Sequence, residues 1–145
     1  MATVRFYDKS HTPEGRLIYS VIPARYRGKW IFVRSSMCSA WGMCAGHIED
    51  GETSDEAAAR ELMEETGALE FSLHRIATYS VENEGVTGYG RLYFAEIIHL
   101  GDIPEGSEIA GRIFEDELPD DLIYPDVQPV LFSRAVKWLR EEGQL

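Results

Sequence analysis

The chain has 145 residues, of which 44% are apolar, and its formal net charge at pH 7 is −11. This length predicts one domain over residues 1–145 with a core of its own, and the charge argues against a nucleic-acid polymer or an anionic membrane as partner. The two cysteines, Cys38 and Cys44, lack the spacing of zinc ligands, and no apolar stretch has the form of a signal peptide or a membrane helix; we therefore expect reduced thiols and a cytoplasmic location.

The first third of the chain is expected to form strands and turns. Residues 4–7 are a short strand candidate, and the apolar run 17–22 fits a buried strand. Residues 26–29 contain a glycine and predict a turn, after which 30–33 return as the second strand of a hairpin. Residues 41–46 are expected to form a strand that leads into a glycine turn.

The stretch 46–68 combines glycines, a helix start and clustered acids. Gly46 and Gly51 are expected in a turn, and residues 53–56 (Thr-Ser-Asp-Glu) have the S/T-x-x-E form of a capping box. Gly67 stands where a left-handed C-cap would end the helix. The sequence therefore predicts a helix with defined ends over most of this stretch.

Three carboxylates of this helix are predicted to share one face. Glu61, Glu64 and Glu65 are spaced i, i+3 and i+4. Glu-rich helices are common, and a run of charge is usually a solvated face. A hard divalent cation, which prefers oxygen ligands, would also compensate the repulsion among the three groups. A solvated face and a metal site are thus the two interpretations.

The same stretch resembles the Nudix box, G-x5-E-x7-R-E-U-x-E-E-x-G-U, in which U is a bulky apolar residue. The matching positions are Gly46, Glu52, Arg60, Glu61, Leu62, Glu64, Glu65 and Gly67. The last position holds Ala68, which is smaller than the usual Ile, Leu or Val. The resemblance to this MutT-like hydrolase family implies an α/β fold: an α/β/α sandwich with a mixed central sheet, in which the box forms a loop–helix–loop.

The rest of the chain is expected to complete the sheet and add a second helix. In order, the patterns predict one or two strands over residues 69–81, a polar loop over 82–88, a central strand over the apolar run 91–100, an acidic loop over 101–111 and a short strand over 112–114. Asp126 is predicted to cap a last helix that has a wide apolar face, with Pro129 in its first turn.

The resemblance implies a Mg²⁺-dependent hydrolase. Its expected substrate carries a diphosphate linkage in a nucleoside-diphosphate-linked compound, with a nucleoside triphosphate or related nucleotide favoured. Mg²⁺, for which Mn²⁺ can substitute, would neutralise the anionic oxygens and lower the pKa of a bound water. The implied metal ligands are Glu61, Glu64, Glu65 and the backbone carbonyl of Ala45.

Further catalytic roles follow from the resemblance. The general base varies in this family, so Glu61 is the candidate within the box and Glu108, in a later loop, is the candidate base or outer ligand. Glu108 is equally well interpreted as a solvated loop carboxylate. Arg60 would hold a catalytic carboxylate by charge-assisted hydrogen bonds, and Glu52 would either pair with Arg60 or join the outer metal shell.

Residues outside the box carry weaker signals. His47 is expected to be a partly exposed loop histidine, and Asp126 or Gln128 is a candidate to read the edge of a base. Four aromatic residues are expected to pack in the core rather than stack on a base: Trp30, Phe32, Trp41 and Tyr89. The sequence identifies no other substrate-binding residue.

Two other functions are alternatives to hydrolysis. Nudix-fold modules that sense a nucleotide without cleaving it usually lose a box carboxylate, whereas this chain keeps them all. An isomerase acting on isopentenyl diphosphate is a known chemistry of the fold, but no placement of Cys and Glu supports it here. Many family members pair through sheets or loops, so the resemblance also implies a homodimer.

Overall fold

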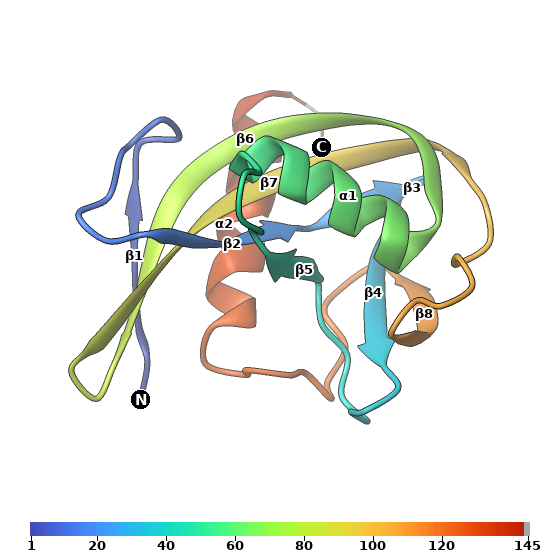
Figure 1. The fold of residues 1–145 in the computed structure, drawn as a ribbon. Coiled ribbons are helices and arrows are strands. Elements are labelled where there is room, and N and C mark those ends of the chain that lie inside the picture. Colours follow the sequence, from blue (N-terminus) through green and yellow to red (C-terminus); the bar gives the residue numbers. More distant parts are fainter. Residues whose placement is uncertain (144–145) are drawn as a thin grey trace.

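The computed structural model describes residues 1–143, in which one mixed sheet lies between two helices (Figure 1). The elements are β1 (Thr3–Tyr7), β2 (Leu17–Ile22), β3 (Ala24–Tyr26), β4 (Lys29–Ser35), β5 (Cys44–His47), α1 (Ser54–Thr66), β6 (Ala68–Asn83), β7 (Val86–Leu100), β8 (Ile109–Glu115) and α2 (Gln128–Glu141). The strand order is β1-β6-β7-β3-β4-β8, and β2 pairs with both β7 and β5. This arrangement confirms the predicted α/β/α sandwich. Neither helix of the described part is long and apolar enough to cross a membrane.

The sheet is mixed because β7 pairs in parallel with β2 and β3 and antiparallel with β6. Side chains of β7 alternate between its faces: Leu92 and Phe94 join the core cluster that includes α2, and Tyr93 and Ala95 join the cluster that includes α1. Burial on both faces explains the nearly continuous apolar run and confirms β7 as a central strand.

Two tight hairpins turn through residues with positive φ. Arg27 and Gly28 (φ 51° and 79°) join β3 to β4, as the sequence predicts, and Glu84 and Gly85 (φ 53° and 81°) join β6 to β7. Positive φ at both central residues matches the twist of the flanking strands. The prediction of a loop over residues 82–88 is wrong, because the strand pairing continues to the residues on either side of this two-residue turn. Polar side chains there are exposed at the tip of a hairpin.

The ends of α1 are those that the sequence predicts. The hydroxyl of Thr53 accepts from the N–H of Glu56 at 3.1 Å, and the Glu56 carboxylate accepts from the N–H of Thr53 at 2.9 Å. Gly67 ends the helix with a φ of 83° and donates its N–H to the carbonyl of Met63 at 3.1 Å. A Cβ at Gly67 would lie 2.6 Å from two carbonyl oxygens of the loop after β7, so glycine is required on steric grounds as well.

The start of α2 differs from the prediction. The N-cap residue is Val127, which makes no side-chain cap, and Pro129 lies in the first turn as expected. The Asp126 carboxylate accepts from the N–H of Ala2 at 3.0 Å instead, so the prediction that Asp126 caps this helix is wrong. The carbonyl of Tyr124, a residue with a φ of 49°, accepts from the first N–H groups of the turn into α2.

Candidate active site

Gly46 lets the box helix approach β5 closely. This residue lies in β5 opposite Ser20, so the prediction that Gly46 is in a turn is wrong, whereas Gly51, with a φ of 85°, does turn the chain. A Cβ at Gly46 would lie only 2.1 Å from Cδ of Glu61. The absence of a side chain at Gly46 therefore allows the Glu61 carboxylate to pack directly on the β5 backbone.

A cleft of ≈550 Å³ brings together most of the predicted site residues. Its acidic lining consists of Glu49, Glu61, Glu64, Glu65, Glu105 and Glu108, and it also contains Ala45 and Arg60. We call it the carboxylate cleft. Six glutamates face one arginine in this lining, so the cleft carries a strong excess of negative charge.

Arg60 is the centre of the ionic network at this cleft. Its guanidinium donates to both oxygens of Glu52 at 2.7 and 2.9 Å, to Glu61 at 2.8 Å and to Glu64 at 3.2 Å. A fifth hydrogen bond, at 3.1 Å, goes to the carbonyl of His47 on β5. The hydrogen bonds from Arg60 lower the pKa of Glu52 to about 2. In turn, the carboxylates of Glu52 and Glu61 raise the pKa of Arg60. Of the two roles expected for Glu52, the structure displays the pairing with Arg60.

Two box glutamates have raised pKa values. Burial raises the pKa of Glu65 to about 7, helped by the charges of Glu61 and Glu64 and opposed by the N–H of Ala45, which donates to Glu65 at 3.0 Å. Partial burial also raises the pKa of Glu61, against the hydrogen bond from Arg60. These carboxylates lack enough nearby positive charge to offset their desolvation.

The chemistry of this donor set fits a divalent cation. Carboxylate and carbonyl oxygens are the ligands that Mg²⁺ prefers, and a cation would supply the charge that Glu61 and Glu65 lack. Within residues 1–143, no three acidic, histidine or cysteine side chains are already arranged as a metal site. Glu61 and Glu64 accept hydrogen bonds from the guanidinium of Arg60, and Glu65 accepts one from the backbone N–H of Ala45. Binding would require the three carboxylates to converge on the ion, and the hydrogen bonds of Glu61 and Glu64 to Arg60 use only one oxygen of each.

Glu108 lies on the loop that closes one side of the carboxylate cleft, immediately before β8. Its backbone carbonyl accepts from the N–H of Ser36 at 2.9 Å, and the neighbouring hydroxyl of Ser107 donates to the carbonyl of Glu64 at 2.9 Å. These bonds fix the loop against α1. The exposed Glu108 side chain is thereby held at the same cleft as the box glutamates, although it is 43 residues away from Glu65 in the sequence.

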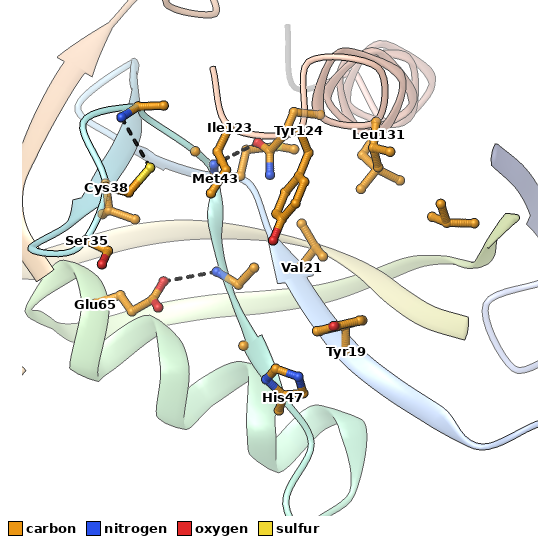
Figure 2. A pocket seen from close by; sticks show the side chains of 18 of the residues that line it. Tyr19, Val21, Ser35, Cys38, Met43, His47, Glu65, Ile123, Tyr124 and Leu131 are labelled. Carbon is orange, nitrogen blue, oxygen red and sulfur yellow. Dashed lines mark hydrogen bonds between the residues drawn. The ribbon is translucent and has the colours of Figure 1, made fainter. Parts of the chain in front are cut away.

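A second cavity, of ≈440 Å³, adjoins the cleft and is mainly apolar (Figure 2). We call it the apolar pocket. The two cavities share Ala45, Gly46, His47, Glu65 and Ile109. The apolar walls come from the sheet, from the residue before β5, from α2 and from the loop before α2: Val21, Val33, Met43, Val81, Ile123 and Leu131. The apolar pocket and the carboxylate cleft therefore lie side by side along these five residues.

Aromatic side chains stand at the mouth of the apolar pocket. Tyr19 and His47 contact each other with ring centroids 4.6 Å apart, and Figure 2 shows the Tyr124 side chain reaching into the space opposite them. His47 is exposed as predicted, but it belongs to β5 rather than to a loop. Tyr89 also lines the pocket, whereas the other aromatic residues named from the sequence pack in or against the core: Trp30, Phe32 and Trp41.

Comparisons with known proteins agree on one family. A family model described as NUDIX domain matches residues 15–123. Over 98 residues the chain is 33% identical to the "Putative 8-oxo-dGTP diphosphatase YtkD" of Bacillus subtilis (strain 168), a match that covers 68% of this chain and 61% of that protein. It is 30% identical over 88 residues to the "Oxidized purine nucleoside triphosphate hydrolase" of Mus musculus, covering 59% of this chain and 56% of the relative. The matches thus span less than two thirds of these relatives.

Solved structures show the same fold. A mutant of the Bacillus subtilis pyrophosphohydrolase BsRppH superposes with a TM-score of 0.76 and 24% identity, covering 94% of this chain and 92% of that one. A NUDIX hydrolase from Nitrosomonas europaea gives a TM-score of 0.69 with 18% identity, covering 83% and 88% of the two chains. At these identities the likeness concerns the fold.

Proposed function

The chain belongs to the Nudix hydrolase family, and from that membership we propose that it hydrolyses a diphosphate linkage in a nucleoside triphosphate or a related nucleotide. One observation carries the proposal: the carboxylate cleft adjoins the apolar pocket, with which it shares five lining residues. A nucleotide combines an anionic phosphate chain with a flat base whose faces can stack on aromatic and apolar side chains. The phosphates would occupy the cleft and the base would occupy the pocket.

The proposed metal ligands are Glu61, Glu64, Glu65 and the carbonyl of Ala45. Bound Mg²⁺ would neutralise the phosphate oxygens and lower the pKa of an attacking water. Arg60 orients Glu61 and Glu64 through hydrogen bonds of 2.8 and 3.2 Å to their carboxylates. Without a cation the negative cleft would repel a phosphate chain, so the protein residues alone are poorly suited to bind this substrate.

Two glutamates compete for the role of general base. Glu61 is half-buried, and a hydrogen bond to Arg60 already holds its carboxylate. Glu108 is exposed and lies on the loop across the cleft. We propose Glu61 as the base within the box and Glu108 as an outer ligand. If Glu108→Gln loses as much activity as a glutamine variant of the box, the assignment is reversed and Glu108 is the base.

The names of the relatives favour a purine nucleoside triphosphate. One relative is named a diphosphatase of 8-oxo-dGTP and another a hydrolase of oxidised purine nucleoside triphosphates. We therefore propose a purine nucleoside triphosphate, in its normal or oxidised form, as the substrate. A volume of ≈440 Å³ lies within the usual range for pockets that take small molecules.

The test is a substrate panel assayed with Mg²⁺ and with EDTA. The panel contains nucleoside triphosphates, oxidised purine triphosphates, ADP-ribose, nucleotide sugars and dinucleoside polyphosphates. The nucleotide products are separated and identified by chromatography, because only the triphosphates release free phosphate or pyrophosphate. We expect Mg²⁺-dependent cleavage of a purine triphosphate that Glu64→Gln abolishes. No cleavage of any compound, together with tight nucleotide binding by calorimetry, would instead identify a nucleotide-sensing module.

A further inference from the structure

Arg134, on α2, carries a positive charge that no described residue offsets. Within residues 1–143, the buried side-chain atom that makes no hydrogen bond is Nη1 of Arg134, and the guanidinium forms no ion pair there. A guanidinium stays charged in a protein, and buried polar atoms almost always have a partner. An unpaired cation is also unexpected in a chain whose net charge is −11. An anionic ligand would supply the missing partner.

A third cavity, of ≈510 Å³, lies between α2 and β1 and contains Arg134. We call it the α2 pocket. Two cationic side chains, one hydroxyl and three apolar residues line it: Arg134, Lys137, Ser133, Phe6, Pro129 and Val130. No acidic residue of the described part belongs to this lining, and the α2 pocket shares no lining residue with the carboxylate cleft or the apolar pocket. It is therefore a separate cavity with an excess of positive charge.

The other donors of the α2 pocket are also available to a ligand. Ser133 and Lys137 are exposed, and within residues 1–143 neither side chain makes a hydrogen bond or an ion pair. Their spacing from Arg134 places all three on one side of the helix. Glu141 continues this side one turn after Lys137, but the two form no ion pair in the described chain. Pairing along the helix therefore does not neutralise the pocket.

We propose that the α2 pocket binds the phosphate group of a small anion, outside the catalytic site. A guanidinium, an ammonium group and a hydroxyl together match the several acceptor oxygens of a dianionic phosphate. A carboxylate has only two oxygens and one charge, so it would use fewer of these donors. The apolar side chains beside the donors offer contacts to an organic group attached to the phosphate. This inference does not depend on the proposed hydrolysis, because the two sites share no residue.

The test is a titration of the isotope-labelled protein, followed by the NMR signals of its backbone amides. Metal-free buffer at constant ionic strength and about pH 8 keeps a phosphate monoester dianionic, and the carboxylate cleft then repels it. The probes are inorganic phosphate and phenyl phosphate, with acetate for comparison. Both phosphates should cause saturable shifts at Phe6, Arg134 and Lys137. Tighter binding of phenyl phosphate would identify a monoester as the ligand, and equal affinities would identify free phosphate; either result supports the site.

Arg140→Gln is the matched control for Arg134→Gln. Both variants remove one arginine from α2, but Arg140 is exposed and does not line the α2 pocket. Arg134→Gln should weaken phosphate binding about tenfold, the loss expected when a charge-assisted hydrogen bond is removed. Lys137→Gln should also weaken it, and Arg140→Gln should leave the affinity unchanged. Thermal unfolding checks the fold of each variant, and Lys137→Gln carries the comparison if Arg134→Gln does not fold.

Four results would overturn the proposal. The first is the absence of saturable shifts at the α2 pocket with either phosphate. The second is a set of shifts confined to residues of the carboxylate cleft, such as Ala45 and Ile109, which would place the ligand there. The third is an equal loss of affinity in Arg134→Gln and Arg140→Gln, which would mean that phosphate responds only to the overall charge of α2. The fourth is acetate binding as tight as that of phosphate, which would remove the preference for a phosphate group.

Discussion

Glu65→Gln is expected to change how the stability of the metal-free protein depends on pH. In the folded chain the pKa of the Glu65 carboxyl rises from its ordinary 4.5 to about 7, chiefly because the side chain is buried. The folded state therefore holds a proton that the unfolded state releases between these pH values. Stability from this group is complete below pH 4.5 and is lost as the pH rises through about 7.

The size of the effect follows from the shift in pKa. A rise of this extent corresponds to about 3 kcal/mol of unfolding free energy. Glutamine can still accept from the N–H of Ala45 and cannot ionise. In EDTA, the variant should match the wild type near pH 4.5 and exceed its stability by about 3 kcal/mol at pH 8, or roughly 10 °C in Tm.

Urea unfolding at several pH values in EDTA measures this difference directly. Comparing the variant with the wild type at each pH cancels the contributions of the carboxylates that do not interact with Glu65. A stability difference that stays constant from pH 4.5 to pH 8 would refute the reasoning, because it would mean that Glu65 titrates alike in the folded and unfolded chains.

Four further outcomes are expected. Glu64→Gln should lower kcat by several orders of magnitude at an unchanged Tm; unchanged turnover would remove Glu64 from the metal ligands. Glu108→Gln should reduce the rate by less than the box variants do, and an equal loss would make Glu108 the base. Gly46→Ala places a Cβ 2.1 Å from Cδ of Glu61 and should lower kcat about a hundredfold. Gly111→Ala is the control, because its Cβ would make only ordinary contacts and should have little effect. Equal rates in the two variants would contradict the role of Gly46. EDTA should abolish activity and added Mg²⁺ should restore it; turnover that persists in EDTA would contradict the metal requirement.

The parts of the fold that the sequence predicts well are governed by near neighbours. The capping box at Thr53 and Glu56 and the left-handed cap at Gly67 depend on a few adjacent residues. The clustering of Glu61 and Glu64 at one cleft follows from helical periodicity alone. The central strand β7 is predictable because burial on both faces requires a continuous apolar run.

The features that the sequence does not reveal depend on contacts between distant segments. Gly46 looks like a turn residue, and only the packing of Glu61 on β5 shows why a side chain is excluded there. Asp126 is of a residue type that often caps helices, but its carboxylate accepts a hydrogen bond from the N–H of Ala2 instead. Gln128 is a candidate from the sequence, but the orientation of its amide follows only from its bond to Met43, 85 residues away.

The most direct test of the proposed activity is the initial rate of phosphate or pyrophosphate release from a purine nucleoside triphosphate. Wild type and Glu64→Gln would be measured in the same Mg²⁺ buffer, and the wild type again in EDTA. We expect turnover by the wild type in Mg²⁺ only and a loss of several orders of magnitude in the variant. Equal rates in all three samples would contradict a metal-dependent hydrolytic site at the carboxylate cleft.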